Sequence, residues 1–151
     1  MTQRTLVILK PDTVVRGISG KITDKFETRG LKLVGCKMQI LGDDLIKDHY
    51  SHLLSKSFFG EIVDYMTSAP VILQVWEGPD AVEIVRRTVG ATNPTEALPG
   101  TIRGDFAVYV GKNVVHASED ATAAEVEVER FFKPEELFSH KRADEHITFG
   151  R

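Results

Sequence analysis

Thr5-Leu6-Val7-Ile8-Leu9-Lys10-Pro11 is a short, apolar run rich in β-branched residues, and it ends at a proline. Because a proline drives the residue before it away from helical geometry, the run is predicted to be a strand that stops there. Residues 18–30 carry apolar side chains at four-residue steps, which indicates an amphipathic helix that begins at a Ser19 N-cap and ends at Gly30. Residues 31–40 read as a second strand.

The rest of the chain repeats this order after a helical insertion. Helical spacing covers residues 43–55 and 59–67, and the polar turn between them predicts a hairpin of two short helices that projects from the sheet. A strand, a helix, a Gly/Pro-rich loop, two strand segments and a last helix follow (70–76, 80–89, 90–104, 106–110, 114–115 and 121–132). The last segment also alternates like a strand, but Asp120 can cap a helix and its alanines favour one.

Two successive strand-helix-strand units define the predicted fold class. It is α+β: a ferredoxin-like α/β sandwich of the split βαβ kind, with a four-stranded antiparallel sheet covered by helices on one face. The helical hairpin and the Gly/Pro-rich loop are additions to it, and a loop of that length in a compact domain is usually functional. No repeat or linker interrupts the sequence, so residues 1–151 are expected to form a single domain.

The composition is that of an ordinary globular protein, with 42% hydrophobic and 27% charged residues. A net charge of −3 argues against a protein whose main task is to bind nucleic acid. No apolar run approaches the roughly 20 residues that span a bilayer, and the first strand is too short for a signal peptide, so a cytoplasmic location is expected. The single cysteine, Cys36, excludes an internal disulfide, and its alternation with Val34 and Met38 predicts a buried side chain.

Asn113-Val114-Val115-His116-Ala117-Ser118-Glu119-Asp120 sets an imidazole between an apolar run and a polar, helix-opening cluster. At the end of a strand, the core can hold a side chain while its tip faces a cavity, which is where a nucleophile would lie. On this ground alone a structural role for His116 stays open. The other histidines stand in polar or helical surroundings and are expected at the surface (His49, His52, His140 and His146).

Cations suited to a phosphate are spread along the chain (Lys10, Arg86, Arg87 and Arg103, with Thr92 nearby). The planar fork of arginine matches phosphate oxygens, so two arginines and a lysine would make a suitable clamp, although each alone is more often a solvated charge. Residues 17–21 invite comparison with a phosphate-binding P-loop. Only two residues separate their glycines and Ile22 follows the lysine, which disfavours that interpretation.

Six linked motifs, which run from about Thr5 to Leu137, resemble those of the nucleoside diphosphate kinases. They stand in the order and spacing of that family: Lys10-Pro11-Asp12 with Arg16-Gly17, Phe58-Phe59, Val75-Trp76-Glu77-Gly78, Gly90-Ala91-Thr92-Asn93-Pro94, Pro99-Gly100-Thr101-Ile102-Arg103-Gly104-Asp105 and Asn113-Val114-Val115-His116-Ala117-Ser118. The family moves the γ-phosphate of a nucleoside triphosphate to a nucleoside diphosphate by a ping-pong route through a phosphohistidine. The resemblance implies this activity, with His116 as the nucleophile.

The resemblance also implies roles for other side chains. Five of them would surround the phosphates (Lys10, Tyr50, Arg86, Thr92 and Arg103), and Lys10 and Asn113 would reach the ribose hydroxyls. Phe58 and Val110 would sandwich the base and Ile62 would complete an apolar wall, which implies low base selectivity because every base has a π face. Glu127 would orient the imidazole, with Ser118 beside it.

The expected cofactor is Mg²⁺, carried by the nucleotide phosphates rather than by a dedicated protein site, with a water-mediated contact to Glu119 as an option. The expected partners are nucleoside tri- and diphosphates. The family assembles as tetramers or hexamers, and the tail after Leu137 favours a hexamer over a tetramer. Nucleic acid is not expected as the main partner, and no membrane association is expected.

Four positions depart from the family pattern. Ala117 and Glu119 replace a usual glycine and aspartate, and an alanine would cost on the order of 1 kcal/mol if the backbone there needs positive φ. Thr13 replaces a glycine, and Ser57 replaces a proline before the paired phenylalanines. Two alternatives therefore stay open: a catalytically weakened relative that binds nucleotides or nucleic acid, and an unrelated ferredoxin-like regulatory domain that only binds nucleotides.

Overall fold

One four-stranded sheet organises the molecule. The computed structural model describes residues 1–150. The strands are β1 (Thr2–Leu9), β2 (Lys32–Gln39), β3 (Val71–Pro79) and β4 (Val115–Ala117). They lie in the order β2-β3-β1-β4 and every neighbouring pair is antiparallel, which confirms the predicted ferredoxin-like fold.

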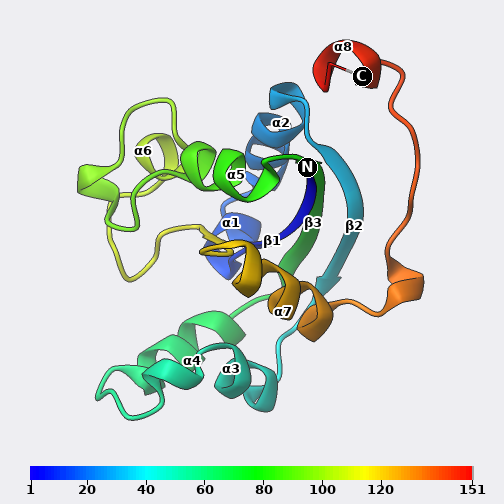
Figure 1. Ribbon diagram of the computed structural model, residues 1–151. Coiled ribbons are helices and arrows are strands. Elements are labelled where there is room, and N and C mark those ends of the chain that lie inside the picture. Colours follow the sequence, from blue (N-terminus) through cyan, green and yellow to red (C-terminus); the bar gives the residue numbers. More distant parts are fainter. Residues whose placement is uncertain (151) are drawn as a thin grey trace.

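Helices cover both faces of this sheet rather than one (Figure 1). The helices are α1 (Pro11–Val15), α2 (Ser19–Arg29), α3 (Asp43–His49), α4 (Phe59–Thr67), α5 (Ala81–Val89), α6 (Ile102–Phe106), α7 (Ala121–Phe131) and α8 (Glu145–Thr148), with short 3-10 turns at Ser51–Leu53, Pro94–Glu96 and Pro134–Glu136. The α2 and α5 helices pack on one face with Val7 and Trp76. The α7 helix and the α3–α4 hairpin pack on the other with Leu6 and Ile8. All four of these sheet residues are fully buried, so β1 lies between two cores.

The helix ends follow the sequence signals in two of three cases. Gly30 ends α2 with a φ of 105°, a backbone conformation that glycine adopts without strain. The Asp120 side chain accepts a hydrogen bond from the Ala123 N–H and caps α7, which confirms that the ambiguous segment is helical. The Ser19 cap was wrong, because Ser19 is the first residue inside α2 and Ile18 stands at the cap without a side-chain bond.

The predicted strand over residues 106–110 was also wrong. Thr101 caps α6 by accepting a hydrogen bond from Gly104 N–H, and this short helix continues to Phe106. The residues that follow form an exposed loop with one isolated bridge between Tyr109 and Lys112. An apolar run of Val, Tyr and Val resembles a strand in sequence, but here no sheet edge pairs with it.

The side chain of Cys36 is exposed rather than buried. A bulge between Leu33 and Gly35 inserts an extra residue into β2, and the residues after it change to the opposite face of the sheet. Cys36 and Met38 therefore leave the core on which Val34 still packs, and Met38 is 60% exposed.

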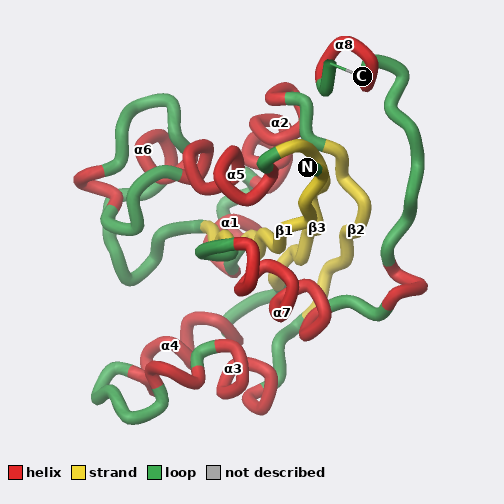
Figure 2. Tube along the Cα trace, viewed as in Figure 1, coloured by secondary structure: helices red, strands yellow, loops and turns green. Residues whose placement is uncertain are grey.

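The chain after Leu137 runs beside β2 as an extended arm that ends in α8 (Figure 2). The Phe138 N–H donates to the Val34 carbonyl at 2.8 Å, and the Lys32 ammonium lies 3.1 Å from the Glu145 carboxylate. The arm is therefore attached to the edge strand near both of its ends. Within residues 1–150, no helix has the length and apolar character needed to cross a membrane.

Candidate active site

His116 lies on β4, where it pairs with Ile8 of the central strand. Its Nε2 atom is 2.6 Å from Oε1 of Glu127 on α7. Ser118 is fully buried behind this pair, and its hydroxyl donates to the same carboxylate oxygen at 3.0 Å. The structure thus brings together the three residues expected to act at the imidazole, with Ser118 contacting Glu127 rather than the cavity.

The charges around this pair select one tautomer. Burial lowers the pKa of His116, and although Glu127 opposes that shift, the imidazole is neutral near pH 7. Burial alone would raise the pKa of Glu127, but the hydrogen bonds from His116 and Ser118 help to lower it overall, so the carboxylate is ionised. A carboxylate only accepts hydrogen bonds, hence Nε2 carries the proton and the lone pair is on Nδ1.

The backbone just before His116 is strained. Val114 has a φ of 64°, which is rare for a β-branched residue, and the Val115 N–H donates to the Asn113 carbonyl at 2.8 Å to close a γ-turn. The Val114 carbonyl accepts from the Thr13 hydroxyl at 2.6 Å and from the Lys10 N–H at 2.9 Å. Such strain persists only where surrounding contacts fix it.

Arg103 fixes the same turn from the other side. Its Nε donates to the Asn113 carbonyl at 3.3 Å and its Nη2 to the Val115 carbonyl at 2.6 Å, while Nη1 donates to the Gly90 carbonyl. Burial and the charge of Arg86 lower the pKa of Arg103 to about 10, so it stays cationic at neutral pH. With five N–H donors on a guanidinium, some remain for a ligand in the cavity.

A cavity of about 700 Å³ opens in front of His116. All five residues expected around the phosphates line it (Lys10, Tyr50, Arg86, Thr92 and Arg103). Asn113, expected at the ribose, and the acidic Glu119 line it as well. The Lys10 ammonium donates to the Asn113 side-chain oxygen at 2.8 Å, and the Asn113 amide donates to the Thr92 carbonyl at 3.1 Å. Burial and Arg103 lower the pKa of Lys10 to about 8, with Asp12 opposing, and burial raises the pKa of Tyr50, whose hydroxyl stays protonated.

A second cavity of about 600 Å³ adjoins the first, because Lys10, Tyr50 and Thr92 line both. Its walls include the apolar residues expected around a base (Phe58, Ile62 and Val110). Phe58 is 45% exposed and Val110 is 50% exposed, so the slot between them is open to solvent. The two cavities together fit a charged group joined to a flat apolar one.

His49 is a residue of the site that the sequence did not reveal. It was expected at the surface, but it is buried, and its ring centroid is 4.6 Å from that of His116 in an edge-to-face arrangement. Burial lowers its pKa to about 3, so it is neutral. Its position on the same helical face as Leu45 was a weak signal that the side chain points inward.

His49, His116 and Glu127 also form the one group of potential metal ligands among residues 1–150, with ligand atoms within 4.8 Å of one another. The Arg130 Nη1 lies 3.0 Å from Nδ1 of His49. Because a guanidinium only donates, Nδ1 of His49 accepts and Nε2 holds the proton. The free lone pair of that imidazole is therefore bound to Arg130 rather than directed at the other two side chains.

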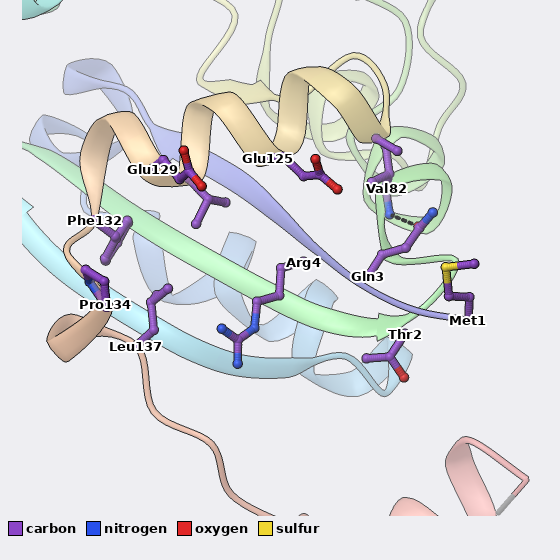
Figure 3. A pocket seen from close by; sticks show the side chains of 12 residues that line it. Met1, Thr2, Gln3, Arg4, Val82, Glu125, Glu129, Phe132, Pro134 and Leu137 are labelled. Atoms are coloured by element: carbon purple, nitrogen blue, oxygen red, sulfur yellow. Dashed lines mark hydrogen bonds between the residues drawn. The ribbon is translucent and has the colours of Figure 1, made fainter.

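Another groove lies beside α7 and the start of β1 (Figure 3). It has a volume of about 780 Å³ and carries Glu125 and Glu129 above an apolar wall that includes Phe132. Its single basic lining residue, Arg4, is paired with Glu77 at 2.7 Å. A groove with this charge does not suit a phosphate.

The structure places three of the four family departures. Ala117 is a β4 residue and is not among those with positive φ, so the alanine carries no backbone cost. The strained position is Val114, three residues earlier. Thr13 contributes a hydrogen bond to that turn which a glycine would lack. The longer Glu119 lines the phosphate cavity.

A neutral, oriented imidazole that faces one lysine and two arginines, beside an apolar slot, defines the class: a phosphotransferase that works on nucleotides. The comparisons agree. The family model described as "Nucleoside diphosphate kinase" matches residues 3–137. A nucleoside diphosphate kinase from Pyrococcus horikoshii is 52% identical over 145 residues, covering 94% of this chain and 92% of the relative.

Solved structures lead to the same family. A halophilic nucleoside diphosphate kinase from Halobacterium salinarum in complex with CDP superposes with a TM-score of 0.95 at 42% identity, covering 99% of each chain. A transition-state mimic of the enzyme from Borrelia burgdorferi, with vanadate and ADP, gives a TM-score of 0.90 at 38% identity, covering 96% of this chain and 95% of that one. The chain belongs to the nucleoside diphosphate kinase family and is a phosphotransferase. The alternatives without catalysis are not favoured.

Proposed function

We propose that this kinase works by a ping-pong mechanism in which Nδ1 of His116 is the nucleophile. The observation that supports this most is the bond between Nε2 of His116 and Glu127, because it leaves the Nδ1 lone pair free beside a cavity lined by Lys10, Arg86 and Arg103. A covalent route suits a single site that serves donor and acceptor in turn.

In the first half-reaction, the Nδ1 lone pair attacks the γ-phosphorus of a nucleoside triphosphate, typically ATP. The P–N bond forms as the bond from phosphorus to the β,γ-bridging oxygen breaks, and the nucleoside diphosphate leaves with that electron pair. Glu127 stabilises the positive charge that develops on the imidazole, while the lysine and the two arginines stabilise the charge on the phosphoryl oxygens. A second diphosphate then reverses these steps.

The rest of the nucleotide would lie across both cavities. We place the phosphates against Tyr50 and Thr92 as well as the three cations, and the ribose hydroxyls near Lys10 and Asn113. The base would enter the slot between Phe58 and Val110 against Ile62. These side chains contact the π face rather than the hydrogen-bonding edge, which predicts weak discrimination among bases.

Family membership implies a divalent-metal requirement, and we propose Mg²⁺. The donor set fits a metal that arrives with the nucleotide, since the cavity offers Glu119 but no cage of carboxylates. Bound Mg²⁺ would neutralise phosphate charge, and Glu119 would contact one of its waters.

Three further properties are proposals. We propose that residues 1–151 act as a single nucleoside diphosphate kinase domain, which the arm's attachments to β2 support. A homo-oligomer, with a hexamer favoured over a tetramer, follows from the family resemblance and the length of the arm. A cytoplasmic location follows from the same resemblance.

The direct test is brief incubation of the protein with Mg-ATP and intact mass measurement under alkaline conditions. One phosphate adduct is expected in the wild type, it should disappear on addition of GDP as GTP forms, and it should be absent from His116→Ala. His140→Ala, a change in the exposed arm, is the matched control and should keep the adduct. An adduct in the His116 variant would refute the assignment.

A further inference from the structure

The strained turn at Val114, directly before β4, is held from two sides that lie far apart in the sequence. On one side, the Thr13 hydroxyl of α1 donates to the Val114 carbonyl at 2.6 Å. On the other side, Arg103 of α6 donates to the carbonyls of Asn113 and Val115 at 3.3 and 2.6 Å. The geometry of the turn thus depends on the spacing between α1 and α6.

Arg16 joins these two helices. It is the C-cap residue of α1, and its Nη1 donates at 2.6 Å to the carbonyl of Phe106, the last residue of α6. Within residues 1–150, no other hydrogen bond connects residues 10–17 directly to α6. The contacts therefore form a closed ring, which runs from α1 through Arg16 to α6, through Arg103 to the turn, and through Thr13 back to α1.

We propose that Arg16 is a positioning residue that sets the spacing of α1 and α6, and thereby keeps the turn before His116 and the Arg103 guanidinium in place for phosphoryl transfer. The proposal deepens the proposed function and rests on it. Arg16 lines neither cavity, so it acts through the Phe106 carbonyl rather than on the nucleotide. The Arg16-Gly17 motif has no role in the mechanism given above.

The chemistry of the bond suits an arginine that is followed by a glycine. The Phe106 carbonyl stands at the C-terminal end of α6, where helix carbonyls lack N–H partners within the helix. A charged donor makes a stronger hydrogen bond to such a carbonyl than a neutral one does. Gly17 has a φ of 67°, so α1 can end at Arg16 and the chain can turn away without strain.

Other contacts hold α6 but do not attach it to α1. Thr101 caps the helix within its own loop, and the Lys25 ammonium on α2 lies 3.1 Å from the Asp105 carboxylate. These contacts fix α6 to its loop and to α2. Loss of the Arg16 donor should therefore leave the helix folded, while its distance from α1 is no longer fixed.

The test compares wild type, Arg16→Met, Arg16→Lys, Thr13→Val and the double variant of Arg16→Met with Thr13→Val. The rate of adduct formation with Mg-ATP is followed by intact mass, and kcat and KM are measured with a diphosphate acceptor. Arg29→Ala is the matched control, because this exposed arginine at the end of α2 lies outside both cavities and outside the ring. Denaturant unfolding establishes that each variant is folded.

In Arg16→Met, the rate of adduct formation and kcat should each fall by about tenfold with little change in KM, because small displacements of charge and nucleophile slow the transfer. Arg16→Lys should recover most of this loss, since an ammonium can donate to the same carbonyl. The double variant should lose less than the product of the two single losses, because either substitution opens the same ring. Arg29→Ala should match the wild type.

Three results would overturn the proposal: wild-type rates in Arg16→Met, no recovery in Arg16→Lys, or a loss in the double variant equal to the product of the single losses. Should Arg16→Met fail to fold, Arg16→Gln takes its place with the same expected losses, because its amide lacks the charge and the reach of the guanidinium. An adduct missing from the wild type would instead refute the proposed function on which the role of Arg16 rests.

Discussion

The phosphate cavity and the base cavity share a boundary but are built differently. In the first, the buried Arg103 and the half-buried Lys10 are bound to named partners: Arg103 donates to three backbone carbonyls and Lys10 to Asn113. In the second, Phe58 and Val110 are about half exposed and are limited to apolar contact. The same molecule thus holds the cations of one cavity by many directional bonds and leaves the side chains of the other cavity open to solvent.

The difference between the cavities corresponds to the different requirements of the phosphate end and the base end of a nucleotide. In-line phosphoryl transfer depends on the placement of charge and nucleophile, and a misplacement of about 1 Å can cost on the order of 100-fold in rate. A base only has to be retained, and stacking tolerates every base. Substitutions in the phosphate cavity should therefore lower kcat, whereas substitutions in the base cavity should raise KM.

The largest effect is expected for Glu127→Gln. The amide keeps an oxygen near Nε2 of His116 but loses the charge that stabilises the imidazolium, so kcat should fall by about 10- to 100-fold while KM changes little. Steady-state kinetics with ATP and a diphosphate acceptor measure this, with Glu125→Gln on the same helix as the control. A change confined to KM would contradict the contrast between the two cavities.

Phe58→Ala should raise KM and leave kcat nearly unchanged, in contrast to Glu127→Gln. Removal of a stacking ring costs about 1–3 kcal/mol per base, so KM should rise about fivefold or more, by similar factors for adenine, guanine and cytosine nucleotides. The value of kcat should stay near that of the wild type, because the imidazole and its cations are unchanged. Strong dependence of the effect on the base would show that the slot reads more than the π face.

Thr13→Val tests how much a single hydrogen bond to the turn before His116 contributes to stability and to kcat. The variant keeps the buried shape but removes the hydroxyl that donates to the Val114 carbonyl. One hydrogen bond is worth about 1 kcal/mol, so we expect a loss of that size in unfolding free energy and about a fivefold decrease in kcat. Denaturant unfolding and kinetics measure both, with the exposed Thr28→Val as the control.

The smallest effect at neutral pH is expected for His49→Phe. The folded protein lowers the pKa of His49 from 6.5 to about 3, so between these values the unfolded chain binds more protons and stability falls as the pH falls. Above pH 6.5 this contribution is constant. The variant lacks it, and its acid unfolding midpoint should therefore move to lower pH. An unchanged midpoint would mean that His49 accepts a proton in the folded protein.

The sequence predicted those parts of the fold that depend on local signals. The apolar run of β1, the glycine that ends α2 and the Asp120 cap of α7 each act within a few residues of themselves. The motifs carried by the resemblance also identified the side chains that line both cavities. For these side chains, the type and order of the residues in the motifs were sufficient.

The failures arose where distant contacts decide. Cys36 is exposed because of a bulge in β2, and the alternation of apolar and polar residues in the sequence does not predict that bulge. Val114 adopts positive φ because Thr13, Lys10 and Arg103 hold the turn, and these residues come from other parts of the chain. His49 is buried against His116 by a ring contact across the fold. Tertiary contacts override local preference in each of these cases.

The position of β4 at the edge of the sheet also has a consequence for biosynthesis. The strands β1, β2 and β3 are complete once residue 79 has left the ribosome. The strand β4 carries His116, and it can pair with β1 only after residue 117 has also emerged. The nascent chain can therefore have most of its sheet while His116 is not yet in place. During that interval the open edge of β1 is available to other chains, so slow translation between residues 79 and 115 should favour aggregation.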